Sequence, residues 1–162
     1  MVYILTGDIQ TGKSYALNEW LKNAPNAVGL LSLCNDNGTR NFTDIRNKQT
    51  FSMHANDKDT EENKIYVGRF VFSKSAFKRA NSIIEYEMQQ TDYSYFIVDE
   101  LGKLELKQNG LYKSTRNLAA KFEGKTNTHL ILVVRSSLLE DVIEHYNLKP
   151  YRILSKEDLK YL

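Results

Sequence analysis

One cysteine, two prolines and no long apolar run limit what this 162-residue chain can be. The single thiol, Cys34, excludes an internal disulfide and a multi-thiolate metal site, and we expect it to be a small buried residue. The longest apolar run, residues 130–134, is far shorter than the about 20 residues that cross a bilayer. The residues after Met1 lack the basic flank and the cleavage site of a signal peptide. We therefore expect a cytoplasmic protein with no membrane contact.

The charges are nearly balanced, with 22 Lys and Arg against 20 Asp and Glu and a formal net charge of +2. A nucleic-acid partner usually requires a clustered basic face, so this balance makes such a partner unlikely. The three histidines are scattered and show no metal-ligand spacing. Hydrophobic residues make up 41% of the chain and charged residues 26%, which is typical of a globular protein. Since no linker composition is visible, we interpret residues 1–162 as one domain.

Strand and helix patterns alternate at both ends of the chain. Residues 2–5, 95–98 and 130–134 are short apolar runs of the kind that buried parallel strands show. Leu17 and Trp20 lie on the apolar face of a helical pattern that we expect to end at Pro25. The alternation predicts an α/β fold of three layers, with helices around a mixed central sheet.

The segment 27–72 has a different pattern. Asn37-Gly38 lies between two strand-like stretches and is a strong hairpin signal. Residues 65–72 are interpreted as one strand, with Tyr66, Phe70 and Phe72 on the same side. The segment as a whole predicts an antiparallel β extension of the sheet.

The rest of the chain predicts three more helices and a last strand. Ser73 is expected to cap a helix, and a second helix is expected over residues 111–122. A capping box from Ser137 to Glu140 predicts a third. Residues 151–154 are expected to be a strand, and Ser155 to begin a terminal helical turn.

A phosphate-binding loop follows the first strand. Residues 7–14 read GDIQTGKS and fit the pattern G-x-x-x-x-G-K-[ST], in which the glycines let backbone N–H groups surround an anion. The helix that follows directs its positive dipole end at the same anion. Lys13 would contact the β- and γ-phosphates, and the side chain of Asp8 is expected to point to solvent. The predicted nucleotide-binding residues are Gly7, Asp8, Ile9, Gln10, Thr11, Gly12, Lys13, Ser14 and Tyr15.

Two adjacent acids end the apolar strand at 95–98. Asp99 is expected to hold Mg²⁺ together with the hydroxyl of Ser14, because Mg²⁺ prefers oxygen ligands. Glu100 is suited to orient or deprotonate a water in line with the γ-phosphate. Arg135 follows the strand expected to neighbour this one, where it would sense or stabilise γ-phosphate charge. The predicted catalytic residues are therefore Lys13, Glu100 and Arg135, with Mg²⁺ as the cofactor.

These motifs resemble the cancer-related nucleoside-triphosphatase family. Residues 98–106 read VDELGKLEL and are similar to that family's V-D-E-[IL]-G-K-M-E-L signature. The phosphate loop matches at its start, and residues 67–71 are similar to the family's V-G-x-Y-x-V stretch. Arg40 and Phe42 lie about where the family has Arg-x-x-Phe. The resemblance implies a RecA-like P-loop NTPase fold with an extra antiparallel ribbon, Mg²⁺ dependence and slow hydrolysis of several nucleoside triphosphates. It also implies that Glu100 is the catalytic glutamate.

The chain departs from the family pattern at two places. Gln10 and Ser14 stand in a loop that often reads Gly-x-Pro-Gly-x-Gly-Lys-Thr in the family. Residues 157–159 read Glu-Asp-Leu where the family tends to have Glu-Asn-Arg.

The sequence therefore predicts a nucleoside-triphosphate phosphohydrolase of broad base selectivity and slow turnover. A nucleotide or nucleoside kinase is the first alternative, since it uses the same loop. It would need an acceptor pocket and usually an arginine-bearing lid, and the absence of an arginine cluster after Lys103 disfavours it. A nucleotide-dependent switch for a protein or RNA partner is the second, with the 27–72 ribbon as its natural binding surface.

Overall fold

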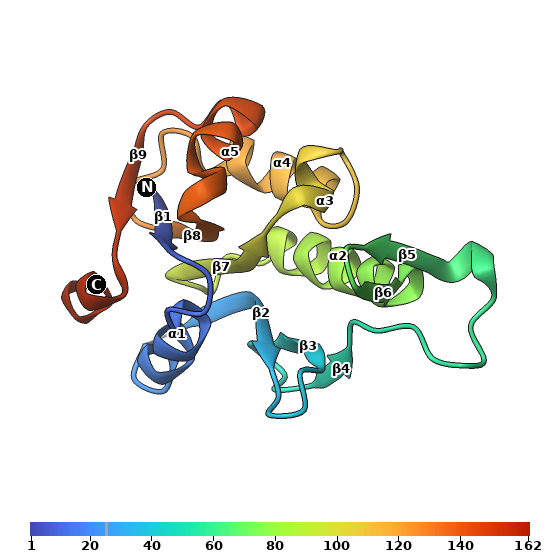
Figure 1. Cartoon of the computed structure of the whole chain (residues 1–162). Helices are drawn as coiled ribbons and strands as arrows, with labels where there is room; N and C mark the ends of the chain where they lie inside the picture. Colours follow the sequence, from blue (N-terminus) through green and yellow to red (C-terminus); the bar gives the residue numbers. More distant parts are fainter. Residues whose placement is uncertain (25) are drawn as a thin grey trace.

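A seven-stranded sheet forms the centre of the molecule (Figure 1). The structure is a computed structural model that describes residues 1–24 and 26–162. The strands lie in the order β4-β3-β2-β7-β8-β1-β9. Strands β2, β7, β8, β1 and β9 run parallel, whereas β3 and β4 continue the sheet antiparallel beyond β2. Their bounds are β1 Val2–Gly7, β2 Ala27–Cys34, β3 Arg40–Asp44, β4 Thr50–Ser52, β7 Tyr95–Leu101, β8 His129–Arg135 and β9 Tyr151–Leu154.

Helices cover both faces of this sheet. Helix α1 (Lys13–Leu21) and the 3-10 turn η3 (Lys156–Tyr161) lie on one face, and α2 (Lys74–Gln89), α4 (Tyr112–Phe122) and α5 (Leu139–Tyr146) on the other (Figure 1). Successive strand residues serve the two faces in turn: Ile4 belongs to the core under α2, α4 and α5, and Leu5 to the core under α1. The predicted three-layer α/β fold with a mixed central sheet is therefore confirmed.

A separate antiparallel pair of strands lies beside α2 (Figure 1). It consists of β5 (Lys64–Val67) and β6 (Phe70–Ser73), and a short 3-10 turn, η1 (Glu61–Asn63), precedes it. The prediction of one strand over 65–72 is wrong, because Gly68 takes a φ of +57° and reverses the chain. Tyr66 is consequently exposed, whereas Phe72 is buried. The predicted antiparallel extension thus has two parts, β3–β4 on the main sheet and this hairpin.

The helix ends agree with the sequence at one predicted cap and differ at another. The Ser73 hydroxyl accepts the N–H of Ala76 and caps α2, as predicted. The capping box expected from Ser137 is wrong, because a 3-10 turn, η2 (Ser136–Leu138), leads directly into α5. Helix α1 ends at Leu21, and the stop expected at Pro25 lies outside the described residues. Within residues 1–24 and 26–162, every helix is too short or too polar to cross a bilayer.

Candidate active site

The phosphate loop connects β1 to α1 at the carboxyl edge of the sheet. Gly12 stands at the start of α1 with a φ of +80°, a left-handed conformation that glycine adopts without strain. Lys13 is buried, and its Nζ donates to the carbonyl oxygens of Gly7 at 2.8 Å and Asp8 at 2.6 Å. Burial lowers the pKa of the Lys13 ammonium, while the nearby Asp99 and Glu100 carboxylates oppose that shift. A fixed cation therefore stands inside the curve of the loop.

Asp99 and Ser14 meet beside this lysine. Asp99 is 1% exposed; its Oδ1 accepts the Ser14 hydroxyl at 3.0 Å and its Oδ2 accepts the Ser32 N–H at 2.9 Å. Burial raises the pKa of this carboxyl to about 7, against the lowering effect of the hydrogen bond from Ser32. Because Asp99 is excluded from solvent, a bound cation would stabilise its ionised carboxylate strongly. A hydroxyl and a carboxylate in contact are also oxygen ligands of the kind that Mg²⁺ takes, so this pair fits that ion.

Ser14 and Asp99 supply only part of the ligand set that a divalent ion needs. Among the described residues, no group of three or more His, Cys, Asp or Glu side chains converges on one point. Mg²⁺ characteristically uses one or two protein oxygens and fills its remaining positions with water and substrate phosphate. Ser14 and Asp99 match this pattern.

Glu100 lies next to Asp99 but points in another direction. Between Val98 and Leu101 the pairing of β7 with β8 shifts its register, and Glu100 takes a φ of +66°. A left-handed glutamate is uncommon, and such backbone strain gathers at functional sites. The irregularity separates the two neighbouring acids, since Asp99 enters the buried contact with Ser14 and Glu100 reaches the cavity edge.

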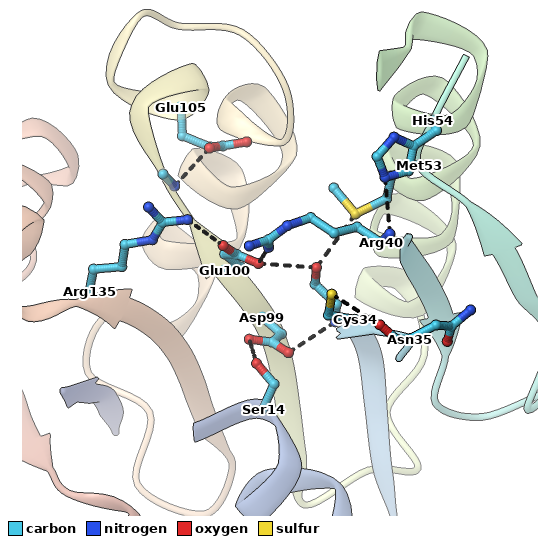
Figure 2. A network of polar contacts seen from close by, with 12 residues as sticks. Ser14, Cys34, Asn35, Arg40, Met53, His54, Asp99, Glu100, Glu105 and Arg135 are labelled. Carbon is cyan, nitrogen blue, oxygen red and sulfur yellow. Dashed lines mark hydrogen bonds and ion pairs between the residues drawn. The ribbon is translucent and has the colours of Figure 1, made fainter. Parts of the chain in front are cut away.

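Two arginines hold the Glu100 carboxylate from opposite sides (Figure 2). Arg135, at the end of β8, donates from Nη2 to Oε1 at 2.7 Å, and Arg40, at the start of β3, pairs with Oε2 through Nη1. The Ser32 hydroxyl also donates to Oε2 at 3.3 Å. These side chains are 21–31% exposed, so solvent screens the pairs only in part. Two guanidinium groups thus lie beside the loop that would hold a triphosphate.

The predicted nucleotide-binding residues largely surround one cavity of about 280 Å³. Residues 9–15 line it, together with Asp99, Glu100 and Arg135. Within this stretch Ile9 and Tyr15 are mainly exposed, at 59% and 68%. The remaining two loop residues, Gly7 and Asp8, hold Lys13 through their carbonyl oxygens. The Asp8 carboxylate is exposed, as predicted, and accepts the hydroxyl of Ser136.

Two residues of this site, Arg40 and Ser32, had no predicted role, and the prediction for a third, Cys34, is wrong. Arg40 was noted only as part of a motif, and Ser32 carried no signal, because both come to the site through the pairing of β2 with β3 and β7. Cys34 was expected to be buried and is exposed, since β2 ends there and the hairpin loop begins. It lies at the edge of the same cavity.

Comparison with known proteins bears on the fold. No family model and no curated protein matches this sequence. Among solved structures, the chain is similar to THEP1 from the hyperthermophile Aquifex aeolicus, with 17% identity over 99% of this chain and 96% of that one and a TM-score of 0.73. It is also similar to a human cancer-related nucleoside triphosphatase, with 14% identity over 99% and 93% of the two chains and a TM-score of 0.65.

This chain has their fold. The predicted three-layer α/β fold is therefore confirmed over nearly the whole chain. The sequence motifs resembled the cancer-related nucleoside-triphosphatase family, and this chain shares its fold with a structure of that description.

Proposed function

We propose that this protein is a Mg²⁺-dependent nucleoside-triphosphate phosphohydrolase. One observation carries the proposal: a buried loop lysine, a Ser–Asp pair suited to Mg²⁺ and a strained glutamate converge on one cavity. The fold shared with a human nucleoside triphosphatase supports the same conclusion. Membership of that family is part of this proposal.

Binding would begin with the loop between β1 and α1. Its backbone N–H groups and the amino end of α1 would surround the β- and γ-phosphates. Lys13 would exchange its carbonyl partners on Gly7 and Asp8 for phosphate oxygens, without leaving its buried position. Ser14 and Asp99 would hold Mg²⁺, which when bound neutralises phosphate charge.

Hydrolysis would depend on Glu100. Glu100 lines the cavity, where its carboxylate would orient a water and take its proton as that oxygen attacks the γ-phosphorus. Arg40 and Arg135 would stabilise the charge that spreads over the γ-phosphate oxygens in the transition state. A guanidinium has five N–H donors, so each arginine has enough donors to hold Glu100 and a phosphate oxygen together.

Two variants separate binding from chemistry. Lys13→Ala removes the buried cation of the loop and is expected to abolish both tight triphosphate binding and turnover. Glu100→Gln is expected to keep affinity within about threefold and to lower kcat by ~10²–10⁴, because a residue that acts on the attacking water matters in the transition state. Calorimetric titration with a non-hydrolysable triphosphate and a phosphate-release assay measure the two effects.

Matched controls are available on the surface. Lys113→Ala and Glu144→Gln change exposed side chains on α4 and α5 and are expected to leave affinity and kcat unchanged. Wild-type affinity in Lys13→Ala would refute the phosphate-loop assignment. If Glu100→Gln retained most of the hydrolysis, the catalytic assignment of Glu100 would be refuted.

Base selectivity is expected to be weak. The residues that converge on the cavity address phosphate and metal, and the sequence carries no evident base-reading motif. We expect purine and pyrimidine triphosphates to be hydrolysed within roughly tenfold of one another in kcat/KM, a spread of ~1.4 kcal/mol. A steady-state comparison of ATP, GTP, CTP and UTP measures this. A thousandfold preference for one base would instead indicate a dedicated enzyme or switch.

A further inference from the structure

A second cavity adjoins the phosphate cavity on the far side of Glu100. It measures about 250 Å³ and shares four wall residues with the first: Ser32, Arg40, Glu100 and Arg135. Its other walls come from the β5–β6 hairpin, from Phe42 of β3, from Met53 just after β4, from Phe77 of α2, and from the segment after β7. The 40–72 segment therefore forms much of a space that adjoins the proposed phosphate cavity through these four shared residues.

The inner wall of this cavity is aromatic. Phe70 and Phe72 are stacked with centroids 5.5 Å apart and an interplanar angle of 11°, and Phe42 meets Phe77 edge-on at 5.2 Å. Phe72 and Phe77 join the two pairs at 5.9 Å, and Leu104 completes the apolar surface. Sites for small organic ligands are mostly apolar with a few polar groups, and their volumes are about 300–1,000 Å³. A cavity just below that range is suited to the ring system of a ligand whose polar part lies at the cavity mouth.

The rim of the same cavity is cationic. Arg40, Arg69, Lys103 and Arg135 line it, against the carboxylate of Glu100 and the buried Glu105. The guanidinium carbons of Arg69 and Arg40 lie 5.0 and 5.4 Å from the centroid of Phe70, so cation–π contact positions both over the aromatic wall. A guanidinium fork recognises phosphate particularly well. The surface thus complements a ring that carries an anionic group.

We propose that this aromatic cavity is an acceptor site for a nucleoside monophosphate, and that the protein passes the γ-phosphoryl group to it. The base would lie against Phe42, Phe70 and Phe72. Its phosphate would lie at the arginine rim, beside Glu100 and next to the γ-phosphate. The proposal rests on the nucleotide site proposed above. In this reaction the monophosphate, in place of water, attacks the γ-phosphorus.

The step balances without a proton acceptor. A monophosphate has a second pKa of about 6, so at pH 8 its oxygen is already ionised. That oxygen forms a bond to the γ-phosphorus while the bond from phosphorus to the β,γ-bridging oxygen breaks. The bridging oxygen keeps the electron pair and leaves as part of the diphosphate. One triphosphate and one monophosphate therefore give two diphosphates, with charge conserved.

The experiment uses the full chain with Mg²⁺ and γ-³²P-labelled ATP or GTP at pH 8. AMP, GMP, CMP, UMP and dTMP are added one at a time, and chromatography separates labelled diphosphate from labelled inorganic phosphate. For at least one monophosphate, we expect label to enter the diphosphate at least tenfold faster than it enters inorganic phosphate. The unphosphorylated nucleosides are tested in parallel and are expected to accept no label.

Variants locate the transfer. Phe70→Ala removes the ring on which both arginines rest, and it is expected to lower the ratio of transfer to hydrolysis at least tenfold. Tyr66→Ala is the matched control, because this 64% exposed ring lies on the paired strand of the same hairpin and outside the cavity. Arg69→Ala changes an exposed rim residue, so the fold is preserved, and it is expected to raise KM for the monophosphate about tenfold.

The outcomes separate this proposal from the hydrolase assignment. Label released only as inorganic phosphate with every monophosphate would overturn the acceptor site and leave hydrolysis standing. Transfer to nucleosides but not to monophosphates would overturn the phosphate-binding role of the rim. Equal transfer ratios in Phe70→Ala and Tyr66→Ala would overturn the cavity as the site. A protein that neither binds nor consumes triphosphate would refute both proposals.

Discussion

The Asp99 carboxylate accepts hydrogen bonds from the Ser14 hydroxyl and the Ser32 N–H and has almost no contact with solvent. An ionised carboxylate in such a place is unfavourable unless a cation balances it, which explains why burial moves its pKa upward. Its neighbour Glu100 is partly exposed and forms ion pairs with two arginines. Two consecutive acids thus have separate environments, in keeping with the separate roles proposed for them.

At this scale, Asp99→Asn is expected to weaken the Mg²⁺ dependence of nucleotide binding. The amide keeps the size of the carboxyl and still accepts the Ser32 N–H, but it has no charge to offer a cation. We expect the Mg²⁺ concentration that gives half-maximal binding to rise about tenfold or more in a titration followed by calorimetry. Asp141→Asn, on the exposed start of α5, is the control. An unchanged Mg²⁺ titration in Asp99→Asn would refute the metal assignment.

A third acid, Glu105, fixes the end of β7, the strand that carries Asp99 and Glu100. After β7 the short helix α3 (Lys103–Leu106) contains Glu105, whose carboxylate accepts the N–H of Gly102 at 2.8 Å and of Leu111 at 3.0 Å. Gly110 approaches this carboxylate so closely that an added Cβ would lie 2.2 Å from its Oε1, at a φ of +63°. Glu105 therefore ties the end of β7 to the start of α4.

The same residue predicts a pH dependence of stability. Burial raises the pKa of Glu105 from 4.5 to about 7, although its backbone hydrogen bonds act in the opposite direction. Between these values the folded state keeps a proton that the unfolded chain has lost. The contribution of Glu105 to the free energy of unfolding therefore falls as pH rises from about 4.5 to 7, and it stays constant above about pH 7. Asp99 contributes with the same sign.

Glu105→Gln isolates this contribution. The variant cannot ionise at this position, so its stability is expected to fall less steeply than that of the wild type between pH 5 and 7. Urea unfolding at half-unit steps of pH measures the two slopes, and the Asp99 contribution is common to both proteins. Parallel pH profiles would show that Glu105 has the same pKa in the folded and unfolded states.

At the scale of the whole molecule, the carboxyl-terminal turn closes the core beneath α1. Leu159 is 3% exposed and packs with Leu5 and Leu17, and the Tyr95 hydroxyl donates to the main-chain oxygen of Leu162 at 2.6 Å. Lys156 donates to the carbonyl oxygen of Thr11 at 2.9 Å, so the turn also contacts the phosphate loop. The two ends of the described chain thus support one site.

Leu159→Ala is expected to lower the free energy of unfolding by ~2–5 kcal/mol, because it leaves a cavity in the smaller of the two cores. Tyr161→Ala, two residues away and 77% exposed, is expected to change it by about 0.5 kcal/mol or less. Urea denaturation followed by circular dichroism measures both. Equal effects of the two substitutions would show that the turn is not packed as described.

The sequence by itself determined the features that depend on neighbouring residues. The phosphate loop is a local device, since its glycines, Lys13 and the start of α1 all lie within residues 7–14. Alternation of short apolar runs with amphipathic helices predicted the three layers, because each pattern reflects the face that its own element must bury. The acid pair at 99–100 was likewise predictable from its place at the end of an apolar strand.

The tertiary structure alone decided what surrounds Glu100. Arg40 and Arg135 lie 60 and 35 residues away from it along the chain. They reach it because of strand order and register, which no local pattern specifies. The turn at Gly68 also escaped the sequence, since an alternating apolar pattern reads alike in one strand or in two paired ones. From that turn comes the hairpin whose phenylalanines form the second cavity, because side chains distant in sequence meet only after the sheet has formed.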